Sequence, residues 1–370
     1  MATVTVSLDG TSKQIVVQES QVKQLFGAEN VEGWGSGETA RSVSLLGATV
    51  DRHDWWDQGR IDTMTSAGVQ FIALVDSDTG LTQLSPLSYA STLAGQVKQF
   101  PGITRWELLN EPFGWWYRGG DNDPASYGKI ARAAITTAKL ANPKARFYVA
   151  LRNEGEDVKL KDGTWIQDWN ARVLAAAPDL FQLCDGFTCH AYDTPTNVGA
   201  LLDKTKAWAW SQPGGNGKPF QITECNLSDQ TSQTEAAEVS AMTGLVQMVK
   251  ARPWIESLLV YAWKSTSQPW LSFLNSDGTP KASRCAAFKA AVQGPVQTVK
   301  AIEATAIGGN AMKAKVHPKV KAGVGVGGVG ALVAWIVGQY GVPVPPEVAV
   351  AVNTIAAFVA SYFTSSTPTP

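Results

Sequence analysis

The sequence predicts an α/β fold, a (β/α)8 TIM barrel, followed by a C-terminal hydrophobic helical hairpin. Three observations lead to this prediction. Between residues 40 and 292, short apolar runs alternate with amphipathic stretches, as they do in a series of βα units. This segment has about the 250 residues that eight such units need. After residue 322 the chain carries almost no charge and is rich in Gly, Ala and Val.

Seven apolar runs are predicted to be barrel strands. They are residues 42–50, 69–75, 103–110, 146–151, 185–190, 219–224 and 257–263. Amphipathic stretches between them predict helices at residues 125–140, 169–177, 198–210 and 234–250. The first barrel strand is the least distinct, and either VTVSL at 4–8 or QIVV at 14–17 is expected to supply it. An open doubly wound sheet is the alternative, but no GxGxxG follows the first strand.

With 370 residues, one large domain plus an appendage is expected. We divide the chain into an N-terminal segment that includes the first strand (1–40), the barrel (41–295), a basic linker (296–321) and the hydrophobic hairpin (322–370). The N-terminus, MATVTVSLDGTSKQ, shows no secretory signal, because no basic region precedes an apolar one.

The hairpin is predicted to consist of two apolar helices separated by VPVPP. Each is close to the ~20 residues that cross a bilayer, and the Lys-rich lead KAKVHPKVK is expected on the cytoplasmic side. The alternative is a soluble hairpin that docks on the barrel or self-associates. With its Lys-rich lead, Gly-rich helix and Pro turn, the hairpin resembles the holin-like hairpins at the ends of actinobacteriophage proteins. That resemblance implies a membrane-associated or virion-associated protein.

Composition excludes several functions. The net charge is −1 and the main body has no basic stripe, so nucleic acid is not an expected partner. Four Cys without a CxxC pair and only three His predict no metal site. The fourteen Trp are unusual, because such amphipathic rings either fill a core or stack on sugars.

Two apolar runs end in a glutamate. WELLNEP places Glu111 at the end of one predicted strand, with Trp115 and Trp116 close behind. FQITECN places Glu224 at the end of another, three strands later. Carboxyl ends of barrel strands form the active-site rim, and a pair of carboxylates there is what glycoside hydrolysis requires.

These motifs resemble the clan A glycoside hydrolases, the retaining (β/α)8 enzymes that include cellulases, mannanases and xylosidases. The resemblance covers residues 40–292 and implies Glu111 as acid/base and Glu224 as nucleophile. It implies that Asn110 binds the sugar 2-hydroxyl. Cys225, after the implied nucleophile, departs from the clan's pattern and leaves the substrate open.

Further positions match the clan in order along the chain. His190-Ala191-Tyr192 resembles the His-x-Tyr that ends strand six beside the nucleophile. Trp263 occupies the place of the sugar-platform tryptophan after strand eight. Arg52 corresponds to the arginine that approaches the nucleophile from strand two, although the adjacent His53 competes for that place.

Each of these residues also has a structural interpretation. Glu111 could be a helix cap, Glu224 a buried ion-pair partner and His190 a core histidine. Trp115, Trp116 and Trp263 could be packing residues, and Glu107, which shares strand parity with Glu111, is expected to be structural.

The function predicted is a retaining glycosidase that cleaves a polysaccharide without metal or organic cofactor, with a bacterial surface glycan as the suggested substrate. The main alternative is a glycan-binding or structural virion protein that keeps the barrel but does not cleave. A second alternative is a lysis factor that acts through the hairpin.

Overall fold

The structure is a computed structural model that describes residues 2–8, 11–17, 24–29, 37–54, 56–227 and 234–296. The chain divides into two compact units, residues 1–306 and 307–370, and the described residues all belong to the first. The predicted hairpin at 322–370 and most of the linker at 296–321 therefore lie outside them. Within the described part, no helix is both long and apolar enough to cross a membrane.

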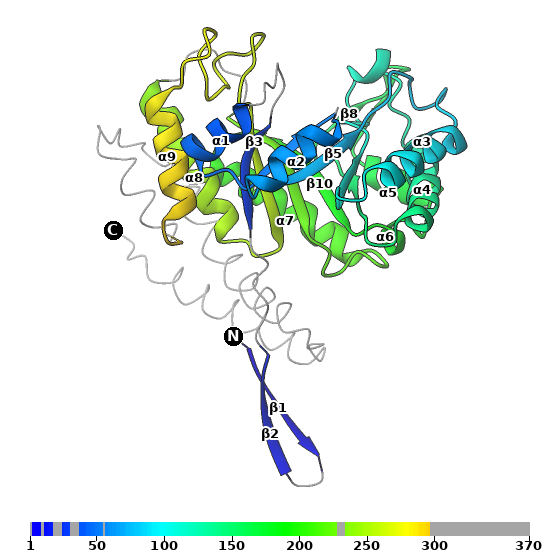
Figure 1. The fold of residues 1–370 in the computed structure, drawn as a ribbon. Helices are drawn as coiled ribbons and strands as arrows, with labels where there is room; N and C mark the ends of the chain where they lie inside the picture. Colours follow the sequence, from blue (N-terminus) through cyan, green and yellow to red (C-terminus); the bar gives the residue numbers. More distant parts are fainter. Residues whose placement is uncertain are drawn as a thin grey trace, which may run out of the picture. The chain divides into compact units, whose positions relative to one another are not determined.

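The predicted eight-stranded parallel barrel is confirmed (Figure 1). In chain order, barrel strands one to eight are β3 (Leu25–Glu29), β4 (Val50–His53), β5 (Gln70–Val75), β6 (Arg105–Leu108), β7 (Arg146–Ala150), β10 (Gly186–Tyr192), β11 (Phe220–Asn226) and β12 (Ile255–Tyr261). The ladder runs β3-β12-β11-β10-β7-β6-β5-β4. Each strand therefore neighbours the next in the chain, and the first and last barrel strands are paired.

The ring closes between β3 and β4. The Thr49 amide donates a hydrogen bond of 2.8 Å to the Phe26 carbonyl across this seam. A Cβ at Gly27 would lie 1.9 Å from the Val50 carbonyl oxygen, so only glycine permits this approach.

Helices surround the barrel (Figure 1). They are α1 (Glu38–Leu46), α2 (Gln58–Ser66), α3 (Pro86–Gln99), α4 (Pro124–Ala141), α5 (Trp169–Ala176), α6 (Leu180–Leu183), α7 (Pro195–Ser211), α8 (Glu235–Lys250) and α9 (Ala282–Gln293), with a 3-10 turn at Tyr117–Gly119. Three of them begin with a capping side chain followed directly by proline. Ser85, Asp123 and Thr194 each accept a hydrogen bond from the amide three residues on.

Two strand predictions at the N-terminal side are wrong. Residues 4–8 and 14–17 belong to an antiparallel hairpin, β1 (Ala2–Leu8) with β2 (Thr11–Val17), and the first barrel strand is Leu25–Glu29 instead. An Asp-Gly pair between the two runs is the usual signal for a hairpin. It marks the runs as partners of each other.

The run at 42–50 was also predicted as a strand, but its first half is helical. Thr39, Ser42 and Leu46 are the buried residues of α1, and their spacing has the period of a helix. Gly47, with a φ of 68°, ends the helix in the left-handed conformation before β4 begins.

A buried ion cluster fills the amino-terminal end of the barrel. Glu256, the second residue of β12, accepts hydrogen bonds from Arg105 (2.8 Å), Arg146 (2.7 Å) and the Tyr148 hydroxyl (2.7 Å). These partners come from strands four and five, on the far side of the ring from strand eight. The contacts therefore cross the barrel interior and tie its opposite walls together.

Candidate active site

A cavity of about 630 Å3 opens at the carboxyl ends of the barrel strands. Most of its lining residues lie within two positions of the carboxyl end of a barrel strand. The lining residues are Glu29, Arg52, His53, Asp54, Leu74, Asp76, Asn110, Glu111, Trp116, Arg152, Glu156, His190, Tyr192, Glu224, Tyr261, Gln268 and Leu271. The structure thus brings together seven of the nine predicted site residues in one cavity, all except Trp115 and Trp263.

Glu111 stands just beyond strand four on an unusual backbone. Leu109 has a φ of 64° and Glu111 a φ of 44°, both in the left-handed region that side chains other than glycine rarely adopt. Such local strain collects at functional sites because the surrounding structure has to hold it in place. One carboxylate oxygen of Glu111 lies 2.8 Å from His190 Nδ1, and the other accepts a hydrogen bond of 2.9 Å from Trp116 Nε1.

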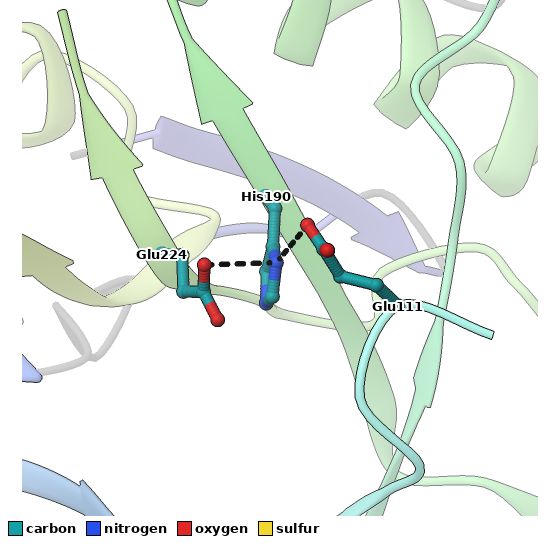
Figure 2. Close-up of side chains that lie close together, drawn as sticks. All are labelled: Glu111, His190 and Glu224. Atoms are coloured by element: carbon teal, nitrogen blue, oxygen red, sulfur yellow. Dashed lines mark hydrogen bonds and ion pairs between the residues drawn. The ribbon is translucent and has the colours of Figure 1, made fainter. Parts of the chain in front are cut away.

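Glu224, in strand seven, is held from two sides. Arg52 donates to one of its oxygens at 3.0 Å, and the Tyr192 hydroxyl donates to the other at 2.7 Å. His190 Nδ1 lies 3.4 Å from the same carboxylate and so stands between the two glutamates (Figure 2). One atom from each of Glu111, His190 and Glu224 lies within 4.8 Å of the others.

Arg52 organises the floor of the cavity. Its side chain is fully buried, and its guanidinium donates to Glu107 at 2.5 Å, to Asn110 Oδ1 at 2.8 Å, to Glu224 and to Glu29. The planar fork of five donors suits arginine to such a set of acceptors. Glu107 points into the barrel as its parity predicted, and it also accepts a hydrogen bond of 3.0 Å from Thr223.

The proton balance at this site differs from that expected for an acid catalyst. Burial lowers the pKa of His190, but Glu224 and the hydrogen bond to Glu111 outweigh burial and raise that pKa to about 9. Burial raises the pKa of Glu111, yet the hydrogen bond and charge of His190 lower it more strongly, so it ends below its ordinary value. The mechanism inferred from the sequence needs a raised pKa at Glu111, and in the ligand-free site the proton resides on His190 instead.

The predicted aromatic residues fall in different places. Trp116 lines the cavity, whereas Trp115 is 64% exposed and is not among the lining residues. Trp263 is 1% exposed, lies outside the cavity lining and donates a hydrogen bond of 2.6 Å to Glu38. It therefore presents no sugar platform to the cavity. Tyr261, two residues earlier, lines the cavity and packs edge-on against Tyr192.

Sequence reasoning missed Glu29, the last residue of strand one. It pairs with Arg52, and its Oε2 is buried without a hydrogen-bond partner among the described residues. Burial, followed by the charge of Glu224, raises its pKa well above the usual value. The available signal was an apolar run ending in glutamate, the same pattern that identified Glu111 and Glu224.

The central trio could also ligate a divalent cation, since two carboxylate oxygens and an imidazole nitrogen lie within reach of one ion. The same atoms already satisfy one another through the hydrogen bond between His190 and Glu111. The trio can therefore stand without an ion.

The sequence matches no protein-family model and no functionally curated protein. Solved structures do resemble the fold. A glucosidase from Croceicoccus marinus is 14% identical with a TM-score of 0.52, and the match covers 74% of this chain and 68% of that one. A GH128 (subgroup I) endo-β-1,3-glucanase from Amycolatopsis mediterranei in complex with laminaritriose is 16% identical with a TM-score of 0.51, over 72% of this chain and 99% of that one.

A family 39 glycoside hydrolase from Bacteroides cellulosilyticus is 17% identical with a TM-score of 0.55, over 76% of this chain and 66% of that one. The fold of residues 24–296 is thus shared with glycoside hydrolases. At these identities the likeness establishes the fold alone.

Proposed function

We propose that the protein is a retaining glycosidase in which Glu111 is the acid/base and Glu224 the nucleophile. The observation that carries the proposal is the convergence of the two carboxylates in one cavity. They come from strands four and seven, and both contact the same nitrogen of His190, at 2.8 and 3.4 Å. Glycoside hydrolysis needs such a pair, one member to protonate the leaving oxygen and the other to stabilise or attack the anomeric carbon.

The spacing of the pair favours retention over inversion. Oxygens of the two carboxylates lie within 4.8 Å of each other. Retaining enzymes have carboxyl groups about 5–5.5 Å apart, whereas inverting enzymes separate them by about 6.5–9.5 Å to admit a water. A spacing this short supports the proposal that Glu224 bonds to the sugar directly.

The reaction follows in two displacements. In the first, a Glu224 oxygen bonds to C1 while the bond from C1 to the glycosidic oxygen breaks, and protonated Glu111 gives its proton to that oxygen. In the second, Glu111 removes a proton from water, the water oxygen bonds to C1, and the ester to Glu224 breaks. Arg52 and Tyr192 each donate a hydrogen bond to Glu224 and so orient it.

His190 is the source of the proton that Glu111 needs. Its Nδ1 lies 2.8 Å from Glu111 Oε1, within direct transfer distance. When a sugar enters and Glu224 begins to share charge with C1, the imidazolium loses part of the carboxylate charge that stabilises it. Transfer of its proton to Glu111 then becomes more favourable. In the second displacement Glu111 takes a proton from water, and this proton returns to His190 when the product leaves.

Polysaccharide is the proposed substrate class. The solved endo-β-1,3-glucanase of this fold binds laminaritriose, so β-1,3-glucan is the first polymer to test here. Trp116 and Tyr261 supply aromatic faces on the cavity wall, which suit stacking against sugar rings. Bacterial cell walls are the second substrate to test.

The test uses the full chain and its Glu111→Gln and Glu224→Gln variants, assayed for reducing-end release. We expect sugar release by the wild type and losses of at least ~10³-fold in both variants. Proton NMR of the first product should show the anomeric configuration of the substrate. Binding of a glycan without any release would instead favour a recognition protein, and initial release of the opposite anomer would overturn retention.

A further inference from the structure

The cavity wall is rich in carboxylates. Six of its lining side chains are acidic: Glu29, Asp54, Asp76, Glu111, Glu156 and Glu224. Arg52 and Arg152 are the guanidinium groups among the lining residues, which also include the two histidines His53 and His190. Carboxylates therefore outnumber cations around the space that a sugar would enter.

Both guanidinium groups already have carboxylate partners. The Arg52 side chain is 0% exposed, and its nitrogens are bound to three carboxylates and to Asn110. Arg152 forms a salt bridge of 3.3 Å with Glu156 and lies over the ring of Phe113. A sugar carboxylate would have to displace one of these partners, because bidentate binding to arginine needs two free donors.

Imidazolium is the remaining positive charge at the centre of the site. His190 is held between Glu111 and Glu224, at 2.8 and 3.4 Å (Figure 2). Its Nε2 lies 3.9 Å from Glu107. Three carboxylates thus surround one imidazole. A fourth carboxylate, brought by the substrate, would meet like charges at close range.

The same wall is well suited to hydroxyl groups. The buried Oε2 of Glu29 has no partner among the described residues, and Asp54 stands at the cavity on the exposed side of strand two. Carboxylate oxygens accept hydrogen bonds from sugar hydroxyls. The hydroxyl groups of an uncharged sugar would therefore find hydrogen-bond acceptors on this wall, whereas the carboxylate of a uronic acid would be repelled by it.

We propose that the cavity takes an uncharged glycan and rejects glycans whose rings carry carboxylates, with Asp54 as a specificity-determining residue. This inference rests on the proposed glycosidase function and narrows its substrate class. Like-charge juxtaposition is an effective means of rejecting a wrong ligand.

The experiment compares laminarin with laminarin oxidised at C6 to carboxylate, and 4-nitrophenyl β-D-glucoside with the corresponding glucuronide. Each pair differs only at C6. We expect the full chain to act on the oxidised member with a kcat/KM at least ~100-fold lower, and we expect 0.5 M NaCl to narrow the gap by screening. Asp54→Asn should narrow the ratio about three- to tenfold. Asp62→Asn, an equal charge change on the exposed face of α2, should leave it unchanged.

Equal or faster cleavage of the carboxylated member overturns this inference and leaves the glycosidase function intact. If no substrate is cleaved, the proposed function fails, and calorimetric binding of laminaritriose and its C6-oxidised form decides the inference separately. Tighter binding of the neutral trisaccharide supports it. Equal or tighter binding of the oxidised form, or failure of both to bind, overturns it.

Discussion

His190 Nδ1 lies 2.8 Å from Glu111 Oε1, and the pKa values of the two groups place the shared proton on the imidazole in the ligand-free site. His190 therefore acts as the proton store, and Glu111 receives the proton from it and donates it to the substrate. The dependence of activity on pH should therefore reflect the titration of the His190–Glu111 pair and not that of a single glutamic acid.

The first prediction concerns the basic limb of the pH profile. The pKa of His190 is raised to about 9, so the pair keeps its proton below that pH and loses it above. Activity should fall as pH rises through about 9. In His190→Gln the proton has to reside on Glu111 alone, and the basic limb of kcat/KM should move down by about 2 pH units or more. His53→Gln, also on the cavity wall, is the control that should not move it. An unmoved limb in His190→Gln would contradict the proton store.

A second prediction concerns Arg52. Arg52→Lys keeps a positive charge but cannot serve Glu29, Glu107, Glu224 and Asn110 with one ammonium group. We expect kcat to drop at least ~100-fold and the free energy of unfolding to fall by about 3 kcal/mol, because buried carboxylates lose their partner. Activity assays and urea unfolding would measure both. Arg132→Lys, at an exposed pair with Asp179, is the matched control and should leave the urea unfolding curve unchanged, because solvent screens an exposed ion pair.

The third prediction separates the two roles of Trp116. Trp116→Phe keeps an aromatic ring but removes the indole N–H that donates to Glu111. Loss of a donor to the ionised carboxylate should raise the pKa of Glu111 and change kcat more than KM. Trp116→Ala should raise KM in addition, about tenfold. Trp115→Phe, off the cavity wall, should change neither constant, and equal effects at both positions would argue against the hydrogen bond as the cause.

The fourth prediction concerns acid stability. Burial raises the pKa of Glu256, but Arg146, Arg105 and Tyr148 outweigh it and lower that pKa to about 2. The stabilisation is therefore complete above the unfolded pKa of about 4.3 and is lost as pH falls through about 2. Glu256→Gln should cost about 2–3 kcal/mol at pH 7, with the gap to wild type closing between about pH 4 and pH 2. Urea unfolding of both proteins across that pH range measures the difference in their free energies of unfolding. A difference that stays constant with pH would refute the lowered pKa of Glu256.

Much of the barrel and of the site could be predicted from the sequence, because strands that are buried on both faces read as continuous apolar runs. The polar residues at the ends of those runs then stand out. Glu111 and Glu224 were found in this way, and the resemblance to clan A glycoside hydrolases added His190 and Tyr192. The barrel brings all four into one cavity.

The misses have equally physical causes. Strand one is only five residues long and contains Gly27, which closes the seam, so it carries little strand signal of its own. Two stronger β patterns precede it, and they pair with each other. Because strand one was not recognised in the sequence, Glu29 at its end was not recognised as a site residue. Trp263 was misplaced because its sequence position does not reveal that its indole turns to Glu38 and away from the cavity.

The pairing of strand one with strand eight has a consequence for the order in which the cavity can form. β3, which ends in Glu29, takes its ladder hydrogen bonds from β12, whose residues lie some 230 positions later in the chain. A ribosome must therefore release nearly the whole barrel before strand one can complete its ladder. Contacts between such distant segments form slowly because a long loop has to close first, so closure of the barrel is expected to limit the rate of folding.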